Sequence, residues 1–126
     1  MDTNELLHTK HSEVITVEHK DTAAVYGSGS LEVFATPAMI ALMEMTCLRS
    51  VNDKIGAGNT TVGIRVEVSH LKASPVGHVI RCDAELVEVD RKRLVFAVRC
   101  FDGEELIGEG RHERFIVDSE KFMSKL

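Results

Sequence analysis

The stretch from Val33 to Ile55 reads VFATPAMIALMEMTCLRSVNDKI and decides the fold. Thr36 followed by Pro37 predicts a helix start, because a threonine oxygen can cap free backbone N–H groups and proline at the first helical position loses no hydrogen bond. Nearly every position from Ala38 to Val51 is apolar. A helix that is apolar on all sides must be surrounded by other structure. The stretch therefore predicts one long, buried helix.

Segments with strand character lie on both sides of this helix. Val14 to Val17 favour a strand, and Thr22 to Tyr26 do so more weakly. After the helix, polar and apolar residues alternate in four segments that are separated by short turns. These segments are Thr60–Lys72, His78–Val89, Arg93–Phe101 and Glu105–Val117. The C-terminal tail, DSEKFMSKL, is expected to form a final helical turn.

The order of these elements predicts the fold class. Consecutive hairpins make an antiparallel sheet, and a single helix is too little to cover both of its faces. A strongly twisted sheet wrapped around one long central helix satisfies both conditions. This is the α+β arrangement of the hotdog fold. It leaves open sheet edges, so pairing with a second copy of the chain is expected.

Length and composition narrow the possible functions. The chain of 126 residues is expected to be a single domain, residues 1–126, with a polar N-terminal lead-in of about residues 1–12. A net charge of −5 argues against a nucleic-acid surface, and no apolar run is long enough for a membrane span. The three cysteines, Cys47, Cys82 and Cys100, lie in apolar surroundings without a CxxC pair. They are expected to be buried free thiols in a cytoplasmic protein.

Three residues of this framework can do chemistry together. Glu44 is an acid inside the apolar helix, where an ionised carboxylate is costly without a partner. Thr36 starts that helix, and His70 lies on the apolar face of the following strand. The three can form a hydrogen-bonded set that activates a nucleophile or water.

Backbone N–H groups at the helix start can stabilise an oxyanion, and those of Ala38 and Met39 are the candidates. Read singly, Thr36 is a helix cap, Glu44 a structural acid paired with an arginine, and His70 a core histidine. The six histidines show no metal-ligand spacing, so neither a metal site nor a cofactor is expected.

Three segments of the sequence, taken together, resemble a known family. VFATPAMIALME, GIRVEVSHLKASPVG and GEGRHER are similar to segments of the fluoroacetyl-CoA-thioesterase-like group of hotdog acyl-CoA thioesterases. The resemblance covers about residues 14–122. It implies a homodimer that hydrolyses an acyl-CoA thioester to a carboxylic acid and free CoA. Carried over by position, the catalytic residues are Thr36, Glu44 and His70, and the active-site glycine and arginine are Gly63 and Arg114.

The segment before the helix departs from the fluoroacetate-specific pattern. That pattern has a longer lid segment with phenylalanine, whereas this chain has the short GSGSLE. The resemblance therefore implies a thioesterase without implying fluoroacetyl-CoA specificity. Glu44 is expected to act as nucleophile or as general base. The acyl group and any assembly of dimers into tetramers remain open.

Two rival functions fit the same fold. One is a hotdog enoyl-CoA hydratase or dehydratase, ranked lower because the acid here comes from the central helix. The other is a non-catalytic acyl-CoA-binding or sensing module. A binding module has no need of a buried acid beside a histidine, so hydrolysis is the preferred interpretation.

Overall fold

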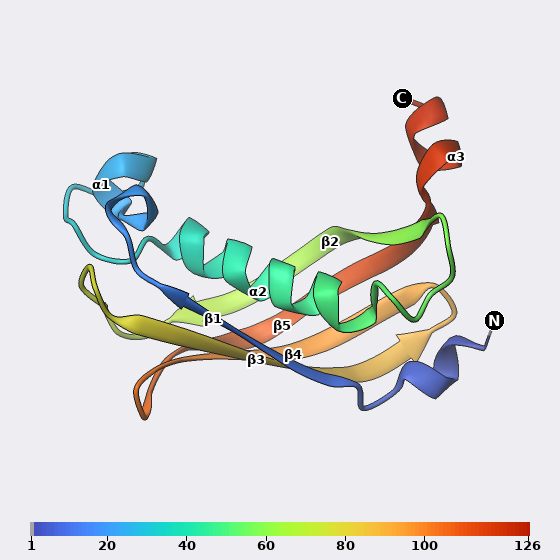
Figure 1. Ribbon diagram of the computed structural model, residues 1–126, viewed down its shortest axis with the longest axis horizontal. Coiled ribbons are helices and arrows are strands. Elements are labelled where there is room, and N and C mark those ends of the chain that lie inside the picture. Colours follow the sequence, from blue (N-terminus) through green and yellow to red (C-terminus); the bar gives the residue numbers. More distant parts are fainter. Residues whose placement is uncertain (1) are drawn as a thin grey trace.

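The apolar run after Thr36-Pro37 forms one long helix that lies inside a curved sheet (Figure 1). The computed structural model describes residues 2–126. The helices, with short 3-10 turns written η, are η1 (Thr3–Leu6), η2 (His19–Asp21), α1 (Ala23–Tyr26), α2 (Thr36–Val51) and α3 (Ser119–Ser124). The strands are β1 (Lys10–Thr16), β2 (Asn59–His70), β3 (Val79–Asp90), β4 (Arg93–Asp102) and β5 (Glu105–Asp118).

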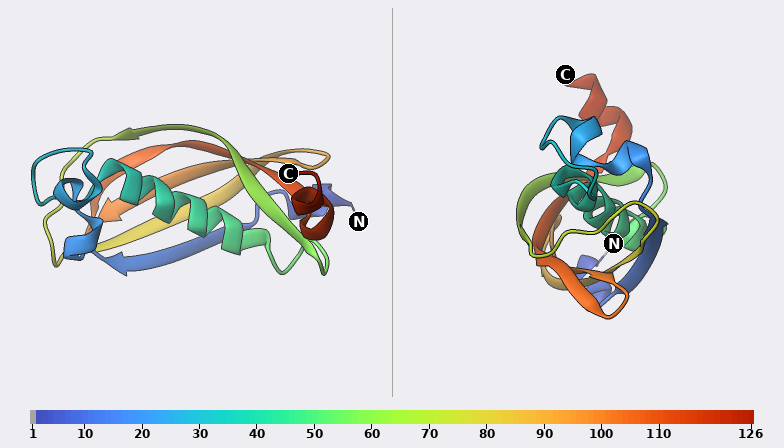
Figure 2. Two further views of the ribbon diagram at one scale, coloured as in Figure 1. Left: turned by 90° about the horizontal axis from the view of Figure 1, so that it is seen from above. Right: turned by 90° about the vertical axis from the view of Figure 1, so that its left-hand side faces the viewer.

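The five strands form one antiparallel sheet in the order β1-β3-β4-β5-β2. The sheet is strongly twisted and curls around α2, which is clear when the molecule is viewed from its end (Figure 2). This arrangement confirms the predicted hotdog fold. Strands β1 and β2 are the two edges, and β2 carries a bulge between Gly63 and Arg65. No helix within residues 2–126 is long and apolar enough to cross a membrane.

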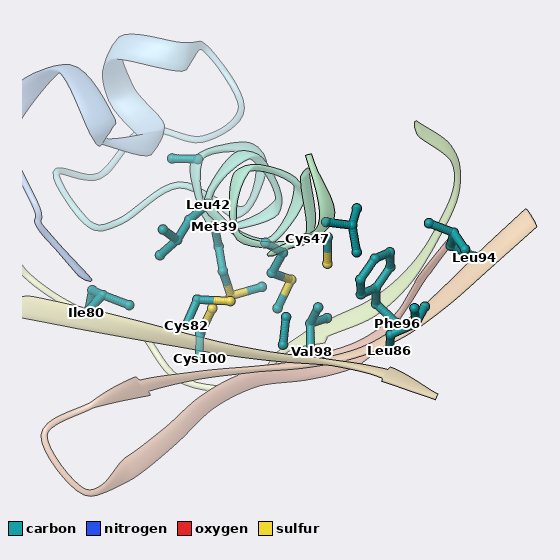
Figure 3. Close-up of a cluster of buried hydrophobic side chains, with 14 of the residues drawn as sticks. Met39, Leu42, Cys47, Ile80, Cys82, Leu86, Leu94, Phe96, Val98 and Cys100 are labelled. Carbon is teal, nitrogen blue, oxygen red and sulfur yellow. The ribbon is translucent and has the colours of Figure 1, made fainter. Parts of the chain in front are cut away.

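The core lies between the concave face of the sheet and one side of α2 (Figure 3). Met39, Leu42 and Cys47 of the helix point toward the strands. They pack against Ile80, Cys82, Leu86, Leu94, Phe96, Val98 and Cys100. The three cysteines are free and buried, as predicted. The alternation of apolar residues in β3 and β4 explains this face, because every second side chain points toward the helix.

The helix is not covered on all sides within one chain, contrary to the prediction. Thr36, Ala41 and Arg49 are exposed, and Ile40 and Leu48 are half-buried. Arg49 lies toward β1, whereas the other four positions and Glu44 fall along the side of the helix that the sheet does not reach. A single five-stranded sheet wraps only part of a helix, so the remaining apolar surface is left without cover.

Two expectations before the helix are wrong in detail. Strand β1 begins at Lys10, four residues before Val14, so part of the polar lead-in belongs to the sheet. The segment after Thr22 is the short helix α1 rather than a strand. The Thr22 side chain accepts a hydrogen bond from the backbone N–H of Val25, and Gly27 ends the turn with a φ of 75°. A cap and a left-handed glycine override the weak strand preference of this segment.

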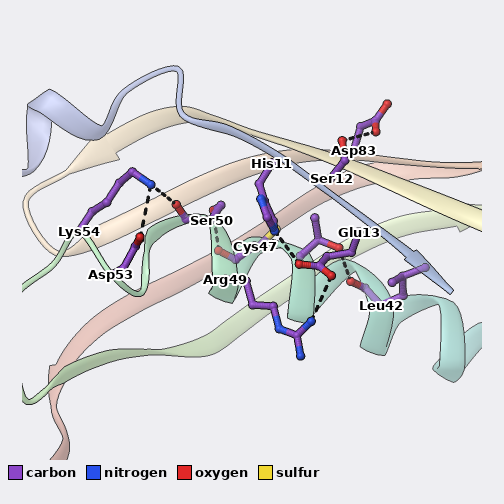
Figure 4. A network of polar contacts seen from close by, with 11 residues as sticks. His11, Ser12, Glu13, Leu42, Cys47, Arg49, Ser50, Asp53, Lys54 and Asp83 are labelled. Atoms are coloured by element: carbon purple, nitrogen blue, oxygen red, sulfur yellow. Dashed lines mark hydrogen bonds and ion pairs between the residues drawn. The ribbon is translucent and has the colours of Figure 1, made fainter.

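The β1 side of α2 is held by polar contacts (Figure 4). Glu13 of β1 lies 2.6 Å from Nε2 of His11 and accepts a hydrogen bond of 3.1 Å from Arg49 of α2. The hydrogen bond with His11 lowers the pKa of the Glu13 carboxyl, so the carboxylate is the stable form. This network fastens the helix to β1. The opposite flank of the helix faces β2 and carries the candidate site.

Candidate active site

Thr36 and His70 form a hydrogen-bonded pair where α2 begins and β2 ends. Thr36 Oγ1 lies 2.8 Å from His70 Nδ1. The predicted cap by the Thr36 side chain is wrong, because the N-cap residue is Ala35 and no side chain caps this helix. The threonine hydroxyl therefore faces the imidazole instead of the helix backbone. This contact is the geometry that a hydroxyl and a proton acceptor need in order to exchange a proton.

The surroundings of His70 favour its neutral form. Burial lowers the pKa of the imidazole, and the backbone at Lys72 opposes this only in part. The ring of Phe34 meets His70 edge-on, with centroids 6.2 Å apart. Nε2 of His70 is buried and has no hydrogen-bond partner within the described residues. A neutral imidazole at pH 7 can accept a proton during a reaction.

A cleft of about 300 Å³ lies beside this pair. Small side chains form much of its wall, among them Ala23, Ser28 and Ala73, and Phe34 lines it as well. Of the two helix-start donors expected from the sequence, Met39 is unavailable, because its N–H donates to the Ala35 carbonyl at 2.9 Å. The N–H of Ala38 remains as the candidate oxyanion donor.

Glu44, Gly63 and Arg114 form a second cluster farther along the helix. Glu44 Oε2 lies 3.9 Å from Nη1 of Arg114. A Cβ placed on Gly63 would lie 3.0 Å from the same Glu44 oxygen, so a side chain at this position would crowd the carboxylate. The Glu44 side chain is 42% exposed, whereas that of Arg114 is 8% exposed. An accessible carboxylate beside a buried cation is suited to attack a substrate or to activate water.

Arg114 is fixed by groups other than Glu44. Its Nε donates to Oγ1 of Thr61 at 2.7 Å, and its Nη2 donates to the Thr61 carbonyl at 2.9 Å. Its Nη1 lies 3.1 Å from Nε2 of His112. In the sequence, His112 is one of six histidines without metal-ligand spacing, and its contact with Arg114 was not predicted. Its position two residues before Arg114 was the available signal, since residues i and i+2 of a strand share a face.

The two clusters are well separated within one chain. Thr36 and Glu44 are eight residues apart on α2, which corresponds to about 12 Å along the helix axis. Gly63 and His70 are seven residues apart on β2, or about 23 Å along the strand. The structure thus brings Thr36 to His70, and Glu44 to Gly63 and Arg114. It does not bring the acid to the threonine–histidine pair.

The described residues 2–126 contain no group of three or more His, Cys, Asp or Glu side chains placed to hold a metal ion. The site groups are instead a hydroxyl, an imidazole, a carboxylate and a guanidinium. These groups can polarise a carbonyl, deliver an oxygen nucleophile and move a proton.

Comparison with known proteins identifies the family. Residues 17–120 match the family described as fluoroacetyl-CoA-specific thioesterase. The fluoroacetyl-CoA thioesterase of Streptantibioticus cattleyicolor is 39% identical over 95 residues, which cover 75% of this chain and 68% of that protein. A crystal structure of the fluoroacetyl-CoA thioesterase FlK superposes with a TM-score of 0.88 at 32% identity, covering 94% of this chain and 93% of that one. A hot-dog-like protein from Thermanaerovibrio acidaminovorans superposes with a TM-score of 0.90 at 24% identity, covering 99% of this chain and 94% of that one. This likeness shows the shared fold.

The fold and these comparisons define a class, the hotdog-fold thioester hydrolases that act on acyl-CoA. Within that class, the chain belongs to the fluoroacetyl-CoA-specific thioesterase family.

The two buried histidines predict that stability falls in mildly acidic solution. Burial lowers the pKa of both His70 and His112 from the ordinary value of 6.5. Near pH 6.5 the unfolded chain therefore takes up protons that the folded chain does not, and the free energy of unfolding decreases as the pH falls further. Well above pH 7 both rings are neutral in the folded and in the unfolded chain, so they no longer make the free energy of unfolding depend on pH.

Melting temperatures of the wild type and of a His70→Gln variant, recorded from pH 8 to pH 5, test this prediction. The wild-type melting temperature should fall below pH 6.5, and the variant should lose part of that slope. A wild-type melting temperature that rises between pH 6.5 and pH 5 would contradict the assigned neutral histidines.

Proposed function

We propose that this thioesterase works as a homodimer in which Thr36 and His70 of one copy meet Glu44, Gly63 and Arg114 of the other. The observation that carries the proposal is the separation of the two clusters along both α2 and β2. A carboxylate about 12 Å from its partners along a rigid helix cannot act with them inside one chain. A second copy related by a two-fold axis supplies the missing half of each site.

Residue spacing on the helix and on the edge strand is compatible with two-fold pairing of this kind. Thr36 and Glu44 each lie four residues from Ile40. An antiparallel pair of α2 helices that cross at Ile40 therefore sets Thr36 beside the partner's Glu44. Antiparallel pairing of two β2 edges, centred between Val66 and Glu67, likewise sets Gly63 beside the partner's His70.

The exposed surface fits this pairing. β2 is an edge strand, so one row of its backbone N–H and C=O groups is free to pair with another strand. Ile64 and Val66 are apolar residues of this strand and are 51% and 41% exposed. The bulge at Ile64 disturbs the alternation, and Val66 lies on the edge strand. Pairing of two β2 edges would bury Ile64 and Val66, and packing of the two α2 helices would bury Ile40 and Leu48.

The reaction that we infer breaks the C–S bond of the thioester and forms a C–O bond. Backbone N–H groups, those of Ala38 and Gly63 being the candidates, polarise the carbonyl. Glu44 supplies the attacking oxygen, either directly or by deprotonating a water molecule. Thr36 orients the reacting groups, and His70 accepts a proton and passes it to the departing CoA sulfur. The net products are a carboxylic acid and free CoA.

The route taken by Glu44 can be read from oxygen labelling. Direct attack forms a mixed anhydride of Glu44, and water that opens it at the enzyme carbonyl leaves an unlabelled Glu44 oxygen in the acid formed in a single turnover in ¹⁸O-water. Attack by water on the thioester, or opening of the anhydride at the substrate carbonyl, places the label in the acid. Unlabelled acid in the first turnover therefore identifies direct attack by Glu44.

We infer that the acyl group accepted is broader than fluoroacetyl. The relatives are named for fluoroacetyl-CoA, and one FlK variant was crystallised with fluoroacetate and CoA. The cleft beside Thr36 and His70 is lined by the small residues Ala23, Ser28 and Ala73 and by the larger residues Val33, Phe34, Leu71 and Lys72. The GSGSLE segment brings no aromatic side chain. The small residues leave part of the wall open to acyl groups larger than fluoroacetyl.

Free-thiol release from a panel of acyl-CoA esters tests this function. The panel contains acetyl, fluoroacetyl, isobutyryl and phenylacetyl esters, and kcat/KM is measured for each. We expect turnover of several members and a preference for fluoroacetyl over acetyl of less than about tenfold, because packing contacts alone discriminate weakly between acyl groups that differ by one atom. A preference of about a thousandfold or more for fluoroacetyl-CoA would contradict the inferred breadth.

We further propose that residues 1–126 act as a single domain and that the protein is cytoplasmic. The five-stranded sheet and α2 share a continuous core, which supports the first proposal. Three buried free thiols suit a reducing compartment, which supports the second. Native mass spectrometry would show the proposed dimer and any further assembly into tetramers.

A further inference from the structure

His112 is a buried polar residue to which the reaction proposed above gives no task. It lies on β5 and is 1% exposed. Its Nδ1 is 2.8 Å from the carbonyl oxygen of Arg65 on β2. A carbonyl oxygen can only accept a hydrogen bond, so Nδ1 must carry a proton and donate it.

The second ring nitrogen is then fixed by its neighbour. Nε2 of His112 lies 3.1 Å from Nη1 of Arg114, and a guanidinium group can only donate. Nε2 must therefore present its lone pair, which makes the ring neutral. Burial lowers the pKa of His112, which agrees with a neutral ring.

The contact between His112 and Arg114 involves the guanidinium nitrogen that lies nearest to Glu44. Nε and Nη2 both bond to Thr61, on one edge of the guanidinium. Nη1, on the other edge, touches His112 and points toward Glu44 at 3.9 Å. Without the acceptor on His112, the guanidinium would keep only its Thr61 edge and could pivot away from the carboxylate.

The same ring supports the bulged part of β2. Arg65 follows the bulge, and its carbonyl is the group that His112 holds. Gly63 lies just before the bulge, where an added Cβ would be 3.3 Å from Cε1 of His112 and 3.0 Å from Oε2 of Glu44. One imidazole thus touches the strand that carries Gly63 and the arginine that faces Glu44.

We propose that His112 is a positioning residue for the thioesterase reaction. Its neutral ring, anchored by the Arg65 carbonyl, accepts from Arg114 and so aims Nη1 at Glu44. His112 itself touches neither the substrate nor the reacting atoms. This inference rests on the proposed function, which gives Glu44 the attacking step.

Two substitutions separate positioning from bulk packing. The Asn side chain of His112→Asn is shorter than histidine, so its amide N–H can still donate to the Arg65 carbonyl but its amide oxygen does not reach Arg114. The Gln side chain of His112→Gln is one methylene longer, so its amide oxygen can reach Arg114 and replace the acceptor. We expect kcat to fall roughly 10- to 100-fold in the Asn variant with little change in KM, because a small misplacement of a catalytic group costs about that much. The Gln variant should keep kcat within about threefold of the wild type.

A double-mutant cycle with Arg114→Ala gives the readout that a purely structural role would not move. If His112 acts through Arg114, adding His112→Asn to Arg114→Ala lowers kcat by less than about twofold further. Melting temperatures of all variants are recorded in parallel. If the Asn variant does not fold, the Gln variant decides, and a loss of kcat above about 30-fold in that variant overturns the proposal.

Other results that overturn it are a wild-type kcat in the folded Asn variant, or losses that multiply in full in the double variant. Failure of the proposed function looks different. If the proposed function is wrong, the Glu44→Ala variant with His112 intact retains turnover, or the wild type releases no thiol at all. Either result also excludes the positioning role of His112, because that role depends on the attack by Glu44.

Discussion

Glu44→Gln should lower kcat for thioester hydrolysis by about 10³-fold or more, because an amide can neither attack the carbonyl nor deprotonate water. The fold should persist. The Glu44 side chain is 42% exposed, and Arg114 keeps its hydrogen bonds to Thr61 and His112. Free-thiol release and thermal melting, measured on the same preparations, test both parts.

Glu13→Gln is the matched control for this substitution. Glu13, like Glu44, lies beside an arginine, and it lies on the opposite flank of α2. We expect it to lower the melting temperature slightly and to leave kcat unchanged, because Glu13 is remote from Thr36 and His70. Near-normal turnover in Glu44→Gln, or an equal loss in both variants, would refute the role of the helix acid.

Gly110→Ala should destabilise the protein by about 3 kcal/mol, at the upper end of the cost of overpacking. Gly110 of β5 faces Val68 of β2 in the ladder. An added Cβ would overlap the carbonyl oxygen of Glu67 and lie 2.6 Å from Cα of Val68. These are backbone atoms, so the strand itself must move. The expected fall in melting temperature is on the order of 10 °C.

Gly108→Ala, two residues away on the same strand, is the control for Gly110→Ala. Its Cβ would meet the thioether end of Met39, with Cε at 2.8 Å, and the Ser69 carbonyl oxygen at 3.2 Å. A flexible methionine can move aside, so the expected cost is about 1 kcal/mol. Equal melting temperatures for the two variants would contradict the close approach of β5 to β2 at Gly110.

Much of the fold was predictable because the sequence patterns are strong. Thr36-Pro37 and the apolar run gave α2 its bounds, and alternation placed β2 to β5 within two residues of their ends. The incorrect predictions concern segments whose secondary structure is determined by local contacts rather than by the hydrophobic pattern. A side-chain cap and Gly27 turn the segment after Thr22 into α1, and pairing with β3 extends β1 back to Lys10.

The candidate site was predictable as a set of residues but not as an arrangement. Residue type singled out Glu44, and the resemblance added Gly63 and Arg114. The contact of Thr36 with His70 replaced the expected helix cap, because the end of β2 lies beside the start of α2. The bulge beside Gly63 and the link from His112 to Arg114 depend on strand register, which spacing along one strand does not determine.

The measurement that tests the two-chain site most directly is the complementation of two inactive variants. Glu44→Ala and His70→Ala are prepared separately, shown to be folded and inactive, and then mixed under conditions that exchange subunits. In a heterodimer, one of the two sites contains both an intact Glu44 and an intact His70. We expect thiol release to return to about one quarter of the wild-type rate, since random exchange makes half of the dimers mixed and each carries one working site. If subunits exchange and no activity returns, Glu44 and His70 act within a single chain, and the proposed two-chain site is wrong.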